Sequence, residues 1–131
     1  MITYGWIAAG GALGTVARFA LQTAVQGALQ RWFGPGTPAF PAGTFAVNIL
    51  GCFAIGLLSA IFVHAPIREE HRLGLIVGVL GGFTTFSSFS FETMQLVAGR
   101  QLPLAAANVF FSCACGLGAV WCGQRVGQWY S

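Results

Sequence analysis

Long apolar stretches alternate with short polar or proline-rich segments along this chain. Each stretch reaches or exceeds the roughly 20 residues that a helix needs to cross the hydrocarbon core of a bilayer. The pattern predicts four membrane-spanning helices, which run approximately over Tyr4–Leu29, Ala42–His64, Leu73–Ala98 and Pro103–Gly127. The sequence therefore favours a single all-α membrane domain over residues 1–131.

Helix-breaking and charged residues separate the predicted spans. Gln30–Pro41 contains three prolines and two glycines, and Ala65–Arg72 contains two of the six Arg and two of the three Glu residues. Gly99–Leu102 forms a short link before the last span. The first apolar run is longer than a signal-peptide core and no basic segment precedes it, so we expect it to be a helix of the mature protein.

Composition supports a membrane location and excludes several classes of protein. Charged residues make up 7% of the chain, against about 25% in an average soluble domain. Hydrophobic residues make up 56%, and the mean hydropathy is +0.74. Six Arg and three Glu residues cannot supply the polar surface of a soluble enzyme. A net charge of +3 is too small for a nucleic-acid-binding surface, so the expected partners are membrane lipid and a second copy of the chain.

The distribution of Arg residues gives little preference for one orientation in the membrane. Arg68, Arg72 and Arg125 fall on the side that carries both termini, and Arg31 and Arg100 fall on the other side. Asymmetry of Lys and Arg between short loops sets membrane orientation. Two interpretations stay open. One is an antiparallel homodimer of dual topology, with a two-fold axis in the membrane plane; the other is a protein of single topology that is oriented by other signals.

Cysteines and histidines give no indication of a metal or catalytic centre. The four cysteines lie inside predicted spans without CxxC spacing, so we expect them to be buried as small apolar side chains. The chain has no Asp, and His64 and His71 fall at loop positions. These features argue against an intramembrane hydrolase, so no enzyme is expected.

The densest group of polar residues within a predicted span is the run Gly81–Glu92, in which hydroxyl residues are interleaved with phenylalanines. A glycine pair followed by two β-branched threonines makes a weak helix. We therefore expect the third helix to be broken near its middle. Such a break frees backbone carbonyls, which in transporters commonly hold a cation.

The same run suggests a path for an anion. Hydroxyl groups donate hydrogen bonds, and phenylalanine rings are positive at their edges. Phe86 and Phe89 share a helix face, where ring edges and hydroxyls can replace part of an anion's water shell. Conduction requires weak binding at several sites of this kind. The alternatives are ordinary helix packing for the phenylalanines and hydrogen bonds to the preceding helical turn for Ser and Thr.

Spans two and four each carry an Asn and a hydroxyl residue one helical turn apart. Thr44 and Asn48 share a face of span two, and Asn108 and Ser112 share a face of span four. An amide inside a membrane either joins two helices or lines a pore. The shared spacing favours a polar track.

Two charged residues fall inside predicted spans, Arg18 in span one and Glu92 in span three. Ionisable residues are costly at membrane depth, so each requires a reason. One interpretation is a buried ion pair, or an Arg that binds helix carbonyls. The other is functional: Arg18 raises the positive potential for an anion, and Glu92 gates or relays along the polar path.

Glycines recur at four-residue intervals in spans one and three. They are Gly10 and Gly14, followed by Gly74, Gly78 and Gly82. Small residues at this spacing permit close contact between membrane helices. The pattern predicts tight helix packing, and such faces also suit a tight dimer.

Three segments together resemble the Fluc (CrcB) family of small dual-topology fluoride channels. Gly81–Glu92 is similar to the family signature Gly-Gly-x-Thr-Thr-Phe-Ser-Thr-Phe-Ser-x-Glu. Gly43–Gly51 in span two, and Gly10–Gly14 followed by Arg18 in span one, resemble the matching family segments. The resemblance covers essentially the whole chain.

The resemblance implies a passive, fluoride-selective ion channel. It implies an antiparallel homodimer with two pores, in the inner (plasma) membrane of a bacterium. Fluoride enters a cell as the acid and dissociates at the higher internal pH. A selective pore then lets the cytoplasmic anion leave down its gradient, which gives fluoride resistance.

The resemblance also implies roles for particular residues. Phe86 and Phe89 are the ring pair that flanks the anion path. The other residues that it implies for the path are Asn48, Ser112, Thr44, Ser87, Ser88, Glu92 and Arg18.

A central sodium ion at the dimer interface is a further implication of the resemblance. Its ligands are the backbone carbonyls of Gly81 and Thr84 in each copy. The chain departs from some members at Asn108 and Gly116, where they carry Tyr and Ser, so the anion positions along span four stay open.

Two alternatives to a channel stay open. A proton-coupled exporter of small molecules or anions would use Glu92 as its proton carrier, although span one carries Arg18 in place of a central carboxylate. A membrane scaffold without transport activity would lose stability but no flux when Phe86 or Glu92 is substituted.

Overall fold

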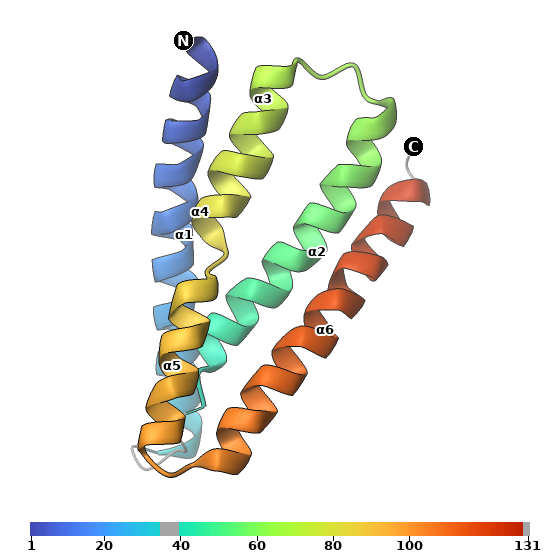
Figure 1. Ribbon diagram of the computed structural model, residues 1–131. Coiled ribbons are helices and arrows are strands. Elements are labelled where there is room, and N and C mark those ends of the chain that lie inside the picture. Colours follow the sequence, from blue (N-terminus) through green and yellow to red (C-terminus); the bar gives the residue numbers. More distant parts are fainter. Residues whose placement is uncertain (35–39, 130–131) are drawn as a thin grey trace.

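The computed structural model describes residues 1–34 and 40–129, and every regular element in these ranges is helical (Figure 1). The elements are α1 (Ile2–Phe33), α2 (Ala42–His64), α3 (Glu69–Leu73), the π-helix η1 (Gly74–Leu80), α4 (Gly81–Phe83), α5 (Phe86–Ala98) and α6 (Leu102–Trp129). The prediction of an all-α protein is confirmed. Most of the predicted loop Gln30–Pro41 lies outside the described residues.

The helices form two adjacent groups (Figure 1). One group contains α1 and the consecutive elements α3 to α5, and the other contains α2 and α6, which run side by side. The start of α1, the connection between α2 and α3, and the end of α6 lie at the same end of the molecule. The turn between α5 and α6 lies at the opposite end, so the predicted grouping of these connections is confirmed.

Three helical segments of the described chain are long and apolar enough to cross a membrane: Ala42–Val63, Glu69–Ala98 and Leu102–Trp129. The predicted first span, Tyr4–Leu29, lies inside α1, which does not meet this criterion although it has 32 residues. The C-terminal half of α1 carries Arg18 and several Gln residues, and these polar side chains reduce the mean hydropathy of the helix. The crossing of the membrane by α1 therefore stays a prediction.

The predicted loop Ala65–Arg72 is too long, because its last four residues belong to α3. Glu69 and Glu70 occupy the first turn of that helix, where negative side chains are favourable near unpaired backbone N–H groups. His71 is consequently helical, and its ring contacts the ring of Trp6 edge-on at 4.7 Å between centroids.

Glycines allow α1 and η1 to approach each other closely. Gly10 lies against Gly74 and Gly78, and a Cβ atom on Gly14 would collide with the backbone carbonyl of Val79. The predicted role of these glycines in tight packing is confirmed. A second close approach was not predicted: Gly56 of α2 lies against Val120 of α6, and Gly123 and Gly127 of α6 lie against α2.

Substitution of Gly14 by Ala is expected to destabilise the protein by about 1–3 kcal/mol, the usual cost of overpacking a close contact. The added methyl group would meet the backbone of Val79, which cannot move aside as a flexible side chain can. Gly5→Ala is the matched control in the same helix, because nothing lies within 4 Å of a Cβ at that position. Thermal unfolding in detergent measures both variants, and equal stability of the two would contradict this packing.

The chain buries polar side chains and exposes apolar ones. Among the described residues the three largest fully buried side chains are those of Val47, Asn108 and Thr44, and two of these are polar. Phe110 and Leu117 of α6 are exposed. The cysteines on α6 (Cys113, Cys115 and Cys122) are also exposed, contrary to the expectation of burial, and Cys113 borders the smaller cavity described below. An apolar exterior around a polar interior is the arrangement that a lipid environment favours.

Candidate functional site

Helical hydrogen bonding is interrupted at Thr84 and Thr85, between α4 and α5. Both residues have extended backbone angles, with φ −81° and ψ 155° at Thr84 and φ −150° and ψ 116° at Thr85. The backbone N–H of Thr85 donates to Asn48 Oδ1 at 2.9 Å, and Asn48 Nδ2 donates to the carbonyl of Thr85 at 3.1 Å. One side-chain amide of α2 thus satisfies both backbone groups of Thr85, as the interior of a membrane protein requires.

The hydroxyl of Thr85 organises the start of α5. It accepts a hydrogen bond from the backbone N–H of Ser88 at 3.1 Å, which caps the helix. The hydroxyls of Ser87 and Ser88 lie 3.2 Å and 3.1 Å from the same oxygen. Neither serine lines the two cavities described below. In the structure the two serine hydroxyls instead bind the hydroxyl of Thr85.

These contacts change the hydrogen bonding of the carbonyls of Gly81 and Thr84. In a continuous α-helix the two carbonyls accept from the N–H groups of Thr85 and Ser88. Here the Thr85 N–H donates to Asn48, and the Ser88 N–H donates to the Thr85 hydroxyl. A Cβ atom on Gly81 would meet nothing within 4 Å, so the backbone borders open space there. Both carbonyl oxygens therefore lack their helical donors.

A cavity of about 400 Å³ brings together residues from α2, η1, α4, α5 and α6. Those predicted for the anion path or the sodium site are Asn48, Gly81, Thr84, Phe86, Phe89 and Ser112. The ring centroids of Phe86 and Phe89 lie 5.6 Å apart, with 44° between the ring planes. The Ser112 hydroxyl is buried without a hydrogen-bond partner in the described chain. A buried hydroxyl of this kind is costly unless something else binds it.

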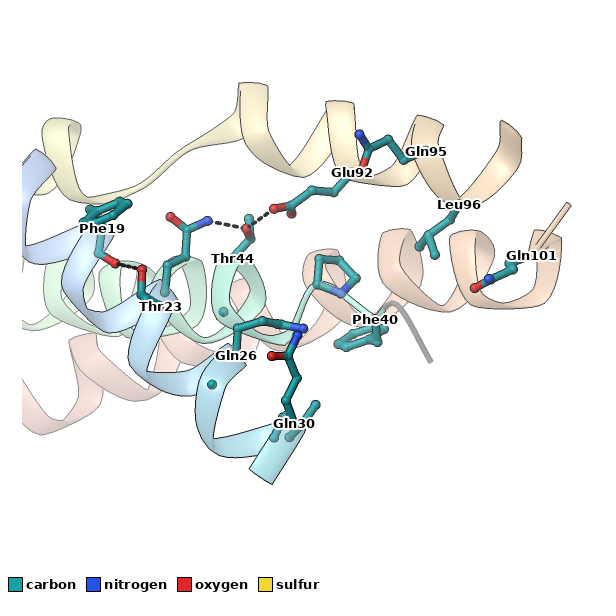
Figure 2. Close-up of a pocket in the computed structure, with 15 residues that line it drawn as sticks. Phe19, Thr23, Gln26, Gln30, Phe40, Thr44, Glu92, Gln95, Leu96 and Gln101 are labelled. Atoms are coloured by element: carbon teal, nitrogen blue, oxygen red, sulfur yellow. Dashed lines mark hydrogen bonds between the residues drawn. The ribbon is translucent and has the colours of Figure 1, made fainter. Parts of the chain in front are cut away.

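A larger cavity of about 860 Å³ is lined by residues of α1, α2 and α5 and by Gln101 of the α5–α6 turn (Figure 2). Gln22 Nε2 donates to Thr44 Oγ1 at 2.5 Å, and Thr44 Oγ1 donates to Glu92 Oε1 at 2.8 Å. The second oxygen, Glu92 Oε2, is buried and has no partner among the described residues. The amide side chains that line this cavity are those of Gln22, Gln26, Gln30, Gln95 and Gln101.

Arg18 and Glu92 do not form the ion pair that was one interpretation of the sequence. Glu92 is bound by Thr44 instead, and the ion pair found in the described ranges joins Arg68 and Glu70 at 3.1 Å. Arg18 is half-buried in α1 and lines neither cavity. The ion-pair interpretation is therefore wrong.

Asn108 joins two helices and does not line either cavity. Its side chain is almost fully buried, and its Nδ2 donates to Thr93 Oγ1 at 2.8 Å. The Thr93 hydroxyl in turn donates to the carbonyl of Phe89 at 2.7 Å. Ser112, one turn away on α6, lines the smaller cavity. Asn108 and Ser112 are thus one helical turn apart on α6, but only Ser112 borders a cavity, whereas Asn108 lies between two helices.

Sequence reasoning missed two of the residues that organise these sites, Gln22 and Thr93. A signal for Gln22 is present, because Arg18, Gln22, Gln26 and Gln30 recur every four residues and form a polar stripe on α1. For Thr93 no comparable pattern exists, since it lies among the other hydroxyl residues of α5 and only the position of Asn108 gives it a partner.

These features define a multi-pass membrane protein with a polar interior and two cavities lined by hydroxyl and amide groups. The chain belongs to the CrcB family: the family model described as "CrcB-like protein, Camphor Resistance (CrcB)" matches residues 5–124. The resemblance found in the sequence is thereby confirmed.

Relatives of this chain cover nearly its whole length. A protein of Pseudomonas putida is 47% identical over 119 residues, which are 89% of this chain and 90% of the relative. A protein of Geotalea uraniireducens is 44% identical over 129 residues, 98% of each chain. A protein of Thermus thermophilus is 44% identical over 127 residues, 97% of this chain and 96% of the relative. Each of the three is named fluoride-specific ion channel FluC.

Proposed function

We propose that this chain is a fluoride-selective ion channel through which cytoplasmic fluoride leaves the cell passively, giving fluoride resistance. The observation that carries the proposal is the shared name of relatives that are 44–47% identical over 89% or more of the chain. These names do not favour the alternative of a proton-coupled exporter that uses Glu92.

The smaller cavity supports an anion path beside Phe86 and Phe89. The buried Ser112 hydroxyl offers a hydrogen bond that the described chain does not use. Asn48 of α2 lines the same cavity. Neutral donors and ring edges bind an anion weakly, which allows it to leave as well as enter.

The working unit is an antiparallel homodimer with two pores in a bacterial inner membrane, and all four long helical segments, α1 included, cross that membrane. Two features support the dimer. Phe86 borders the smaller cavity and yet is 79% exposed in a single chain. A second chain packed against Phe86 would close that side of the path. The Arg residues are also nearly balanced between the two ends. Crosslinking in membranes that captured only parallel pairs or monomers would overturn this arrangement.

A sodium ion at the centre of the dimer is part of the proposal. The residues present fit such an ion, because the carbonyls of Gly81 and Thr84 lack their helical donors and the Gly81 backbone borders open space. Oxygen atoms of unwound backbone are suitable ligands for sodium. The ion would supply positive charge at an interface where carbonyl dipoles converge. In the described residues no group of three His, Cys, Asp or Glu side chains offers a different metal site.

Efflux from liposomes tests the function. Purified protein in liposomes loaded with fluoride is expected to release it rapidly in the absence of a pH gradient, when a potassium ionophore clamps the voltage. Liposomes loaded with chloride are expected to retain it. Equal release of both anions would contradict the proposed selectivity, and no fluoride release without a pH gradient would favour the exporter.

A further inference from the structure

The hydrogen bonds at the larger cavity begin on α1 with Gln22. A hydroxyl group has one proton to donate and two lone pairs to accept with. Gln22 Nε2 donates to Thr44 Oγ1 at 2.5 Å, and this bond occupies one lone pair. The single proton of Thr44 is therefore directed away from Gln22, to Glu92 Oε1 at 2.8 Å (Figure 2).

Thr44 differs from other hydroxyl residues in the helices of this chain. Thr23, Ser90 and Thr93 each donate to the backbone carbonyl four residues earlier. Ser and Thr inside helices commonly form that bond, because the carbonyl of the same helix lies within reach and no other helix is needed. Thr44 donates across to another helix instead, to the carboxylate of Glu92, while it accepts from Gln22 of α1.

Glu92 depends on this arrangement for its position. Oε1 is bound by Thr44, and Oε2 is buried with no partner among the described residues. The other polar side chains that line the larger cavity are neutral, namely five Gln and two Thr residues. In the described part of the chain no cation of this cavity compensates the carboxylate, so its place is fixed by the hydroxyl of Thr44.

We propose that Gln22 is a positioning residue of the anion path, which acts through Thr44 on Glu92. It keeps the Thr44 proton directed into the cavity and thereby holds the Glu92 carboxylate in one place. Without Gln22, the Thr44 hydroxyl loses the amide contact from α1 that holds it opposite Glu92. The cavity then loses the amide donor of Gln22, and the bond that restrains the carboxylate is weakened because Thr44 is no longer fixed from its other side. This inference rests on the proposed function, because the path is one for fluoride.

Fluoride efflux from liposomes tests the inference with a double-mutant cycle. Gln22→Leu keeps the size of the side chain and removes the donor, and it is expected to slow efflux about tenfold, which corresponds to about 1.4 kcal/mol. In a Thr44→Val background the same substitution is expected to change the rate less than about twofold, because two residues that act through one contact are not additive. Gln26→Leu is the matched control, one turn away on the same cavity. An equal loss from Gln22→Leu in both backgrounds, or from Gln26→Leu, would overturn the inference.

Infrared spectroscopy supplies a readout that does not depend on flux. The carboxylate band of Glu92 is identified by its loss in Glu92→Gln, and it is expected to shift alike in Gln22→Leu and Thr44→Val but not in Gln26→Leu. A band that Gln22→Leu leaves in place would overturn the positioning role. If the wild-type protein releases no fluoride while this band shifts as expected, the proposed function is wrong and the positioning of Glu92 stands.

Discussion

Substitution of Asn48 by Leu is expected to abolish measurable fluoride efflux and to destabilise the protein. The amide of Asn48 satisfies both the N–H and the carbonyl of Thr85, where the backbone leaves the helix. Each buried polar group that loses its partner costs about 1–3 kcal/mol. Two such groups lower the free energy of unfolding by about 2–6 kcal/mol, which thermal unfolding in detergent measures alongside efflux.

Asn108→Leu is the matched control for Asn48→Leu. The two substitutions are identical in chemistry, and Asn108 is the more deeply buried of the two side chains. Asn108 binds the hydroxyl of Thr93, which keeps its bond to the carbonyl of Phe89 when the amide is removed. A smaller loss of stability and a residual fluoride flux are therefore expected. Wild-type flux in Asn48→Leu, or a greater loss in Asn108→Leu, would contradict the role assigned to Asn48.

Substitution of Phe86 or Phe89 by Ile is expected to slow fluoride efflux about a hundredfold, which corresponds to about 2.7 kcal/mol. Ile keeps an apolar side chain of moderate size but has no ring edge to offer an anion. Because Phe86 is mostly exposed in the single chain, its substitution should change the stability of that chain little. Efflux and thermal unfolding measured together separate a loss of conduction from a loss of folding.

Phe91→Ile is the control for the ring pair. Phe91 lies on the same helix and is 65% exposed, but it does not line the smaller cavity. Its substitution is expected to leave efflux within about twofold of the wild-type rate, since exposed apolar positions tolerate such changes. Equal effects at Phe86, Phe89 and Phe91 would show that the phenylalanines pack helices and do not flank an anion path.

The sequence was sufficient to predict the all-α class and the contact between α1 and η1. Apolar run length and glycine spacing are local properties, and Gly10 meets Gly74 and Gly78 while Gly14 meets the backbone of Val79 in the same contact. The π-helical geometry of η1 was not predicted, because its seven residues read as ordinary apolar helix. The limited hydropathy of α1 was also not predicted, although Gln22, Gln26 and Gln30 lower the hydropathy of this otherwise apolar run.

The candidate site was only partly predictable, because hydrogen-bond partners depend on how whole helices are placed. Asn48, Phe86, Phe89 and Ser112 do meet at one cavity, as residues of one polar track should. The sequence could not show that Asn48 binds the backbone of Thr85, since the two lie on different helices.

The same limit applies to Gln22. It reaches Thr44 because glycine contacts bring α1 against the neighbouring helices, as where Gly43 of α2 lies against the backbone of Gln22 itself. A pattern within one helix carries no information on such a partner.

The reversal potential of the fluoride current in a planar bilayer tests passive, selective conduction most directly. With a tenfold fluoride gradient and equal pH on both sides, the current is expected to reverse at the equilibrium potential of a monovalent anion, about 59 mV in magnitude. When most of the fluoride on one side is replaced by chloride, the reversal potential should shift by the amount that the new fluoride gradient alone predicts. A pH gradient should leave it in place. A reversal potential that follows the pH gradient, or one that responds to chloride as it does to fluoride, would contradict a passive fluoride channel.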